Sequence, residues 1–145
     1  MHKHNIKLKL LHPDARIPSY ATDGSGAFDF FAPEPFSVEG GESVVVPLGL
    51  AVEVPEDYTL LLFSRSGHGF KHDLRLSNCV GVIDSDYRGE VKVKLRSDAR
   101  DEGFVNTVDK AVAQGALFHT PRVSFSVVQE LSDTKRGASG FGSTG

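Results

Sequence analysis

The chain has 145 residues with a formal net charge of −3, and 24% of its residues are charged. This length suits one domain with a buried core, while the slightly acidic balance gives no electrostatic support for a nucleic-acid surface. A lone cysteine excludes an intramolecular disulfide, no apolar run approaches the roughly 20 residues of a membrane span, and no signal-peptide core is visible, so we expect a cytoplasmic protein without membrane or nucleic-acid partners.

Short apolar runs separated by turn residues are typical of the whole chain, which contains fifteen glycines and seven prolines. This composition predicts many short strands joined by turns, and therefore an all-β fold. Most of the strands are marked by alternating apolar and polar residues, and the lysines that alternate in the first strand suit the edge of a sheet. The predicted strands lie at residues 6–10, 27–32, 59–63, 91–95 and 123–127.

Two residues fit these strands poorly. Asp29 lies among three phenylalanines, and a carboxylate is expensive to bury unless it is paired or hydrogen-bonded. It therefore either faces solvent from an alternating strand or has a partner. Pro47 lies within the mostly apolar residues 42–54, and because proline cannot donate to a strand ladder it argues against an uninterrupted central strand there.

A short basic segment with two glycines, residues 64–72, follows the third predicted strand. Arg65 offers a planar set of N–H donors, Ser66 adds a hydroxyl, and Gly67 lets the backbone approach an anion closely. Taken alone, this is a weak phosphate-binding pattern.

Residues 81–90 combine backbone freedom with clustered polar groups. Two β-forming residues are followed by two carboxylates, a phenol and a guanidinium, among them Asp84 and Tyr87. Because the alternating residues 91–95 come next, the pattern predicts a β-hairpin arm that carries a site, and the alternative is a solvated turn. Asn78 precedes this stretch and can offer both a donor and an acceptor, or can form an Asx turn.

The last third of the chain is more ambiguous. Apolar residues between Val108 and Gly115 fit one face of a short helix. The final ten residues, 136–145, contain four glycines and cannot form part of a packed core, so they are either a disordered tail or a lid that closes over a ligand. We therefore divide the chain into a single β domain, 1–135, and a flexible C-terminal lid, 136–145.

Five stretches of this sequence, in order, resemble the five motifs of the trimeric dUTPases. The resemblance runs from about Ala21 to Gly145 and includes Asp84-Ser85-Asp86-Tyr87 as the core of the third motif. It implies a jelly-roll-like subunit that assembles as a homotrimer, with active sites shared between subunits. The implied reaction is the Mg²⁺-dependent hydrolysis of dUTP to dUMP and pyrophosphate, at the bond between the α- and β-phosphates.

The resemblance also implies roles for individual residues. Asp84 would orient the attacking water and accept its proton, and Asp29 would reach the Mg²⁺ through water while the triphosphate holds most of the metal. Tyr87 would pack against the deoxyribose and exclude a 2′-hydroxyl, and Phe141 would stack on uracil after the tail closes over a neighbouring subunit. The matching substrate-binding positions are Arg65, Ser66, Gly67, Asn78, Gly81, Tyr87, Gln114, Arg136, Phe141, Gly142, Ser143 and Thr144.

The sequence departs from the family pattern at three positions. Ser64 stands where a proline is usual, Asp73 where a glycine is common, and Ala111 where an arginine or lysine is usual. Around Ala111 the resemblance implies a turn at residues 109–110 that enters a strand with Gln114, and we follow it in place of the helix. Two other functions remain open: a dCTP deaminase of the same superfamily, or a non-catalytic, regulatory jelly-roll module that binds a nucleotide.

Overall fold

The computed structural model describes residues 4–142. These residues form eleven strands and one short helix, which confirms the predicted all-β class. No helix in this part of the chain is long and apolar enough to cross a membrane. The elements are β1 (Lys7–Leu10), β2 (Ser19–Tyr20), β3 (Phe28–Phe31), β4 (Phe36–Val38), β5 (Ser43–Glu53), β6 (Tyr58–Phe63), α1 (Ser66–His72), β7 (Leu74–Leu76), β8 (Val80–Ile83), β9 (Glu90–Ser97), β10 (Phe104–Asn106) and β11 (Ala111–His119).

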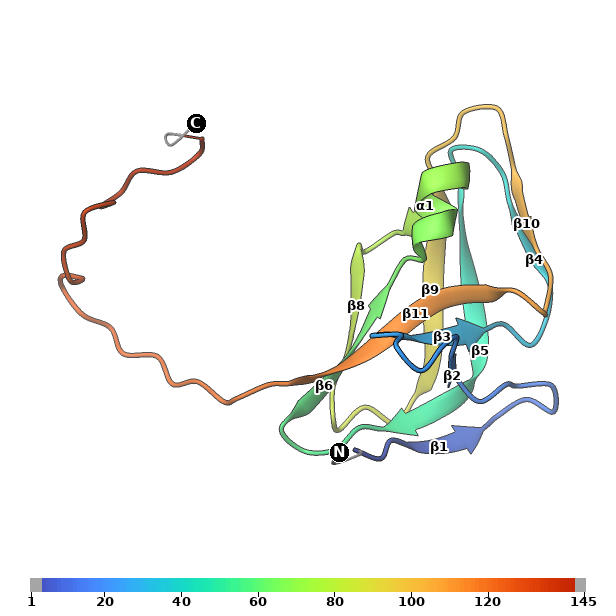
Figure 1. The fold of residues 1–145 in the computed structure, drawn as a ribbon, viewed down its shortest axis with the longest axis horizontal. Coiled ribbons are helices and arrows are strands. Elements are labelled where there is room, and N and C mark those ends of the chain that lie inside the picture. The colour runs from blue at the N-terminus through green and yellow to red at the C-terminus, as the bar shows by residue number, and fades with distance from the viewer. Residues whose placement is uncertain (1–3, 143–145) are drawn as a thin grey trace.

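Two antiparallel sheets form a jelly-roll-like sandwich (Figure 1). The first sheet has the strand order β1-β5-β9-β7, and the second sheet has the order β2-β3-β11-β6-β8. Strand β4 pairs with β10 in a small third sheet. The core consists of the inward-facing side chains of both large sheets. In β9, for example, Val91, Val93 and Leu95 are buried while Lys92 and Lys94 are exposed, which is the alternation that the sequence predicted.

The region around Pro47 is one continuous strand, β5, although its pairing is interrupted. The pairing of β5 with β9 shifts register between Pro47 and Ala51. Between these residues Gly49 has a positive φ of 68°, and a Cβ there would lie 2.9 Å from the Cβ of His12. Because β1 pairs only with residues 50–53, Pro47 lies where one side of β5 has no strand partner among the described residues.

Two predicted strand arrangements are wrong. β8 and β9 follow one another in the chain, but β8 pairs with β6, whereas β9 pairs with β5 and β7. They belong to different sheets, so they do not form the predicted hairpin. Residues 123–127 have no strand partner among the described residues, and Phe125 is 93% exposed, since an extended segment becomes a strand only when another strand binds its backbone.

The segment before Gln114 follows the resemblance and not the helical pattern. A turn is closed by a 3.0 Å hydrogen bond from the N–H of Lys110 to the carbonyl of Thr107. Strand β11 then begins at Ala111 and includes Gln114. The side-chain amide of Asn106 donates to the carbonyls of Thr107 and Lys110, so this buried residue holds the turn from inside.

The chain leaves the sandwich after β11. Residues 121–142 contain no strand or helix, and Figure 1 shows them running far from the two sheets. We call residues 121–142 the arm. Several of its apolar side chains are strongly exposed, including Phe125, Val127 and Leu131.

Gly115 provides a test of how tightly the side chains of neighbouring strands pack in the core. A Cβ at this position would lie 2.7 Å from Cε2 of Phe30 and 3.2 Å from Cδ1 of Leu60, so both rigid neighbours would have to move. We expect Gly115→Ala to lower the free energy of unfolding by about 1–3 kcal/mol, as overpacked cores do. Urea unfolding measures this change. Gly24→Ala is the control, because nothing lies within 4 Å of a Cβ at Gly24; equal unfolding midpoints for the two variants would contradict the prediction.

Candidate functional site

A polar pocket of about 310 Å³ lies beside the second sheet and gathers predicted site residues from three separated stretches of the chain. The loop of residues 21–27 covers one side of it, and Ser25 and Gly26 are part of its lining. The predicted site residues in the pocket are Asp29, Arg65, Ser66, Gly67 and Gln114. The sequence does not predict Ser25 as a site residue, because a serine in a glycine-containing loop indicates only a turn.

The side chains of this pocket are held by hydrogen bonds to the backbone. Nη1 of Arg65 donates to the carbonyl of Ala111 at 3.0 Å, and its Nε lies 3.7 Å from Oδ1 of Asp29. Nε2 of Gln114 donates to the carbonyl of Ser64 at 3.2 Å. The side chain of Asp29 is only 21% exposed and has a cationic partner, Arg65. Of the two alternatives for Asp29, the structure therefore shows the paired carboxylate.

The basic segment after β6 is a helix and not the open glycine loop that the sequence suggested. Arg65 is the N-cap residue, with extended backbone angles, and Ser66 begins α1. The C-cap residue after the helix is Asp73, which has the left-handed conformation (φ 49°, ψ 32°). Glycine adopts this conformation at the lowest cost, which gives a physical reason why a glycine is common at this position in the resembling family.

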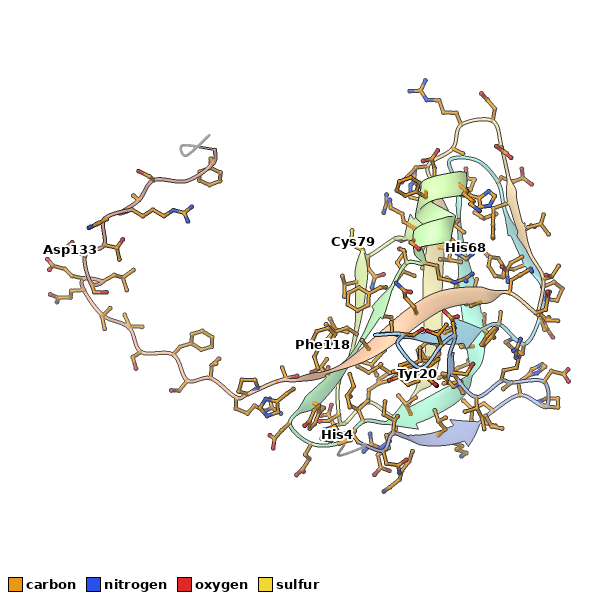
Figure 2. The ribbon with its side chains drawn as sticks, viewed as in Figure 1. His4, Tyr20, His68, Cys79, Phe118 and Asp133 are labelled. Carbon is orange, nitrogen blue, oxygen red and sulfur yellow. The ribbon has the colours of Figure 1, made fainter. Side chains whose placement is uncertain are left out.

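His68 is the buried residue of this helix (Figure 2). Its side chain packs edge-on against Phe104, with 5.1 Å between the ring centroids, and its Nδ1 has no hydrogen-bond partner among the described residues. Burial lowers the pKa of the His68 imidazole to about 4, and the positive charges of Arg65 and His72 act in the same direction. His68 is therefore neutral at neutral pH.

A second cavity, of about 220 Å³, opens between β8 and β9 and includes Asn78 and Gly81 in its lining. Strand β7 pairs only with residues 95–97 of β9, and the N–H of Ser77 binds the carbonyl of Lys94. On that side of β9, the backbone at residues 92–93 consequently faces the cavity without a strand partner in the described part of the chain. Such an edge presents donors and acceptors in a row, as a planar base requires.

Local geometry explains the residue types at this cavity. A Cβ at Gly81 would lie 3.1 Å from the Cβ of Leu62, so a larger residue there would require the neighbouring strand to move by a few tenths of an ångström. The amide of Asn78 donates to the carbonyl of Val80 at 3.2 Å, in a tight turn whose exposed Cys79 has a positive φ of 65°. Asn78 therefore takes part in a turn, but its side-chain amide donates to a carbonyl and does not accept a backbone N–H as in an Asx turn.

Lys92 and Lys94 also line this cavity, although the sequence does not predict them as site residues. Their alternation with buried residues indicated only that they face away from the core, which they do. Nothing in that pattern distinguishes a lysine beside a cavity from one on an open surface.

Asp84 and Tyr87 lie in the exposed connection between β8 and β9, away from the polar pocket. Asp29, Gln114, Phe63 and Val80 occupy one row across four neighbouring strands, and Asp84 follows Val80 by four residues. With strands about 4.8 Å apart and about 3.3 Å per residue along a strand, Asp84 lies roughly 20 Å from Asp29. One chain therefore does not bring these two carboxylates together.

The predicted tail residues lie on the arm, far from both cavities (Figure 1). Nε of Arg136 donates to the nearby carbonyl of Ser139, and the side chain of Phe141 is fully exposed. Gly142 has a positive φ of 83°. The predicted residues Ser143 and Thr144 lie outside the described part of the chain. Figure 2 labels Asp133, which shows how far the arm extends from the sandwich.

Comparison with known proteins gives a consistent result. The family model described as dUTPase matches residues 13–145. The deoxyuridine 5′-triphosphate nucleotidohydrolase of Nautilia profundicola is 40% identical over 97% of this chain and 98% of its own length, and that of Helicobacter pylori is 38% identical over 97% and 96%. A solved structure of the Staphylococcus bacteriophage 80alpha dUTPase with dUPNHPP matches 99% of both chains at 26% identity, with a TM-score of 0.89.

The buried His68 predicts how stability depends on pH. Its pKa in the folded state, about 4, is below the value of about 6.5 expected for an unfolded chain, so the unfolded state binds the proton first. The free energy of unfolding should therefore fall by about 3 kcal/mol as the pH decreases from about 6.5 to 4. His68→Leu should remove most of this decrease, whereas the control His119→Leu, at an exposed histidine of β11 that does not act on the pKa of His68, should retain it. Urea unfolding at several pH values measures the free energy of unfolding of each variant. If this free energy depends equally on pH in the wild type and in His68→Leu, the prediction is contradicted.

Proposed function

Because this chain belongs to the dUTPase family, we propose that it hydrolyses dUTP to dUMP and pyrophosphate, and that the two cavities divide the substrate between them. The observation that carries this proposal is the polar pocket, where side chains from three separated stretches meet: Asp29, Arg65 with Ser66, and Gln114. Such a concentration of donors suits a phosphate chain.

The polar pocket would receive the phosphates. The described contacts of Arg65 use its Nη1 and Nε, so further guanidinium N–H groups remain for phosphate oxygens, and Ser66 and Gln114 add neutral donors. Donors that are already held by the backbone need little reorganisation when charge builds on the leaving pyrophosphate. These residues would therefore orient the phosphates and stabilise the transition state.

The cavity between β8 and β9 would receive uracil. The uracil ring presents an N–H between two carbonyl oxygens, which can pair with the unpaired backbone edge at residues 92–93 and with the amide of Asn78. Gly81 leaves room for a flat ring because it adds no side chain to the lining. The base would then lie close to the connection that holds Asp84 and Tyr87.

Asp84 would act on the attacking water. Its carboxylate is exposed and has no bonded partner among the described residues, so it is available to orient a water molecule and accept its proton. The water oxygen forms a bond to the α-phosphorus, the bond to the β-phosphate breaks, and pyrophosphate leaves with its charge held in the polar pocket. Tyr87 would pack against the deoxyribose, where its ring leaves no room for a 2′-hydroxyl.

The residues present fit a Mg²⁺ ion that the substrate brings. No group of three or more His, Cys, Asp or Glu side chains in the described residues could hold a metal ion by itself. Mg²⁺ keeps several waters and binds phosphate oxygens readily, so the single carboxylate of Asp29 can contact its water shell. When bound, the ion would neutralise phosphate charge, and Arg65 would hold Asp29 in place.

The active site is proposed to be shared between copies in a homotrimer. Asp84 and the polar pocket lie roughly 20 Å apart in one chain, according to the strand spacing, whereas the triphosphate and sugar of one nucleotide have to reach both. Two copies can satisfy this requirement if the β8–β9 connection of one lies against the polar pocket of the other. The exposed apolar side chains of Val80, Val82 and Phe118 on the second sheet suit such a contact.

We propose that the lid begins after Lys135 and consists of residues 136–145. Arg136 and Phe141 make no contact with the sandwich among the described residues, and both can be directed at a nucleotide once the arm crosses to a neighbouring copy. Phe141 would stack on uracil, while Arg136, Ser143 and Thr144 would donate to the phosphates. The polar pocket, the β8–β9 connection and the lid would then each come from a different chain, so the assembled site would use three chains.

The pyrophosphatase is favoured over the two alternatives by the residues at the connection. A dCTP deaminase would release ammonia, which an ammonia assay with dCTP detects. A purely regulatory nucleotide-binding module would not need the exposed carboxylate of Asp84 beside the base cavity. Release of pyrophosphate from dUTP is the test of the proposed function. We also propose a cytoplasmic location, because the exposed Cys79 without a disulfide suits a reducing compartment.

Asp84→Asn should bind dUTP and fold like the wild type but lose activity by about a hundredfold to ten-thousandfold, because an amide cannot accept the proton of the water. Steady-state release of pyrophosphate gives kcat, and calorimetric titration with a non-hydrolysable dUTP analogue gives the affinity. A variant that retains the wild-type kcat would refute the role of Asp84.

A chain that ends at Lys135 should keep its thermal stability and its oligomeric state, yet turn over dUTP much more slowly. Ordering the missing residues costs about 1–2 kcal/mol each in backbone entropy, and only a bound nucleotide offsets this cost. Mixing this shortened chain with Asp84→Asn, under conditions of subunit exchange, should restore part of the activity. Each chain alone is the control; no recovery in the mixture would contradict the shared site, and unfolding of the shortened chain would show that the tail is structural.

A further inference from the structure

The connection between β8 and β9, residues 84–89, crosses from one sheet to the other, and we call it the crossover loop. It carries Asp84 and Tyr87, and a 3.2 Å hydrogen bond from the N–H of Tyr87 to the carbonyl of Asp84 closes its turn. Both side chains are exposed, so the core does not hold them. Catalysis needs its groups fixed to within about an ångström, so contacts inside the loop have to provide that order.

Arg88 provides two such contacts. Its Nη1 donates to the carbonyl of Ser85 at 2.7 Å and to the carbonyl of Tyr87 at 3.1 Å. One nitrogen therefore joins the carbonyl of Ser85, the second residue of the turn, to the carbonyl of Tyr87, its last residue. Hydrogen bonds from a charged donor are roughly twice as strong as neutral ones, so this bridge can hold an exposed turn that has little other support.

Gly89 and the carbonyl of Glu90 hold the ring of Tyr87. The phenol of Tyr87 donates to that carbonyl at 3.0 Å. The ring crosses directly over Gly89: a Cβ built there would lie 2.4 Å from Oη of Tyr87 and 2.6 Å from its Cζ. Any side chain at position 89 would therefore push the ring off the glycine and break its bond to Glu90.

The charge of Arg88 also has a small effect on the first sheet. The pKa of the Glu53 carboxyl is lowered, chiefly by the hydrogen bond and the charge of Lys7 and to a smaller degree by the charge of Arg88. Glu53 is the last residue of β5. Arg88 and Glu53 form no ion pair in the described residues, so the hydrogen bonds of Arg88 within the loop remain its main contacts.

We propose that Arg88 and Gly89 are positioning residues for the proposed dUTP hydrolysis: Arg88 fixes the turn that carries Asp84, and Gly89 fixes the ring of Tyr87 and with it the selection of deoxyribose. This inference rests on the proposed function. Neither residue needs to touch the substrate, since both act through their neighbours in the crossover loop.

Arg88→Ala should lower kcat for dUTP roughly ten- to hundredfold, because Asp84 loses its fixed position. KM should change little and should not become more sensitive to salt. Arg88→Gln, which retains a neutral donor, and Arg88→Lys, which retains a charged one, should each recover part of the loss. Arg100→Ala, at an exposed arginine in the connection from β9 to β10, is the matched control and should behave like the wild type.

The alternatives for Arg88 give different results. If Arg88 bound a phosphate directly, KM would rise, the rise would depend on salt, and Lys but not Gln would restore activity. If Arg88 only joined two subunits, Arg88→Ala would change the elution volume in size-exclusion chromatography. Either result, or a wild-type kcat for Arg88→Ala, would overturn its positioning role.

Gly89→Ala should lower the ratio of kcat/KM for dUTP to that for UTP, toward the value of Tyr87→Ala, in which the ring is gone. Tyr87→Phe removes only the bond to Glu90 and should lower the ratio in the same direction, so it tests the same placement if Gly89→Ala does not fold. An unchanged ratio in both variants would overturn the role of Gly89.

These outcomes separate the inference from the proposed function. A wild-type chain that releases no pyrophosphate from dUTP would overturn the proposed function. In that case, amide exchange at Tyr87 still decides whether Arg88 holds the loop: it should be faster in Arg88→Ala than in the wild type and in Arg100→Ala, and equal rates in all three would overturn the inference.

Discussion

The pairing of β11 with two neighbours at once is the constraint on which the polar pocket depends. Gln114 lies opposite Asp29 on one side and opposite Phe63 on the other, so this strand fixes the lateral order of the pocket. The carbonyl of Ala111, at the start of the same strand, holds the guanidinium of Arg65. A shift of β11 by one residue would turn Gln114 to the other face of the sheet and release all of these contacts together.

The same constraint keeps the pocket away from the crossover loop. The strands of a packed sandwich cannot bend far enough to move Asp84 across three strand spacings to the polar pocket. The rigidity that orders the pocket therefore also means that one chain is not sufficient for the proposed reaction. Association resolves this conflict without loosening the core. The crossover loop then has to keep its own shape before a second copy arrives, and the bridge from Arg88 gives it an internal support.

The arm presents the opposite physical situation. Its backbone has no strand partner among the described residues, and side chains such as Phe125 and Val127 are exposed to a degree that soluble chains rarely tolerate over a continuous segment. Ordering such a segment costs about 1–2 kcal/mol per residue, which local contacts such as that of Arg136 with Ser139 do not offset. In the proposed trimer, a neighbouring subunit and the nucleotide supply the missing contacts.

The sequence by itself determined the strands at residues 6–10, 27–32, 59–63 and 91–95, because alternation with a period of two and glycine-rich turns are local properties of the chain. The resemblance also indicated the turn before Gln114, which the helical periodicity obscured. Only the tertiary structure decided that β8 and β9 lie in different sheets, that Asp29 is paired with Arg65, and that residues 123–127 remain unpaired in one chain. The physical reason is that an alternating pattern specifies which face of a strand is buried, whereas the partner on its hydrogen-bonding edge is chosen by packing over the whole core.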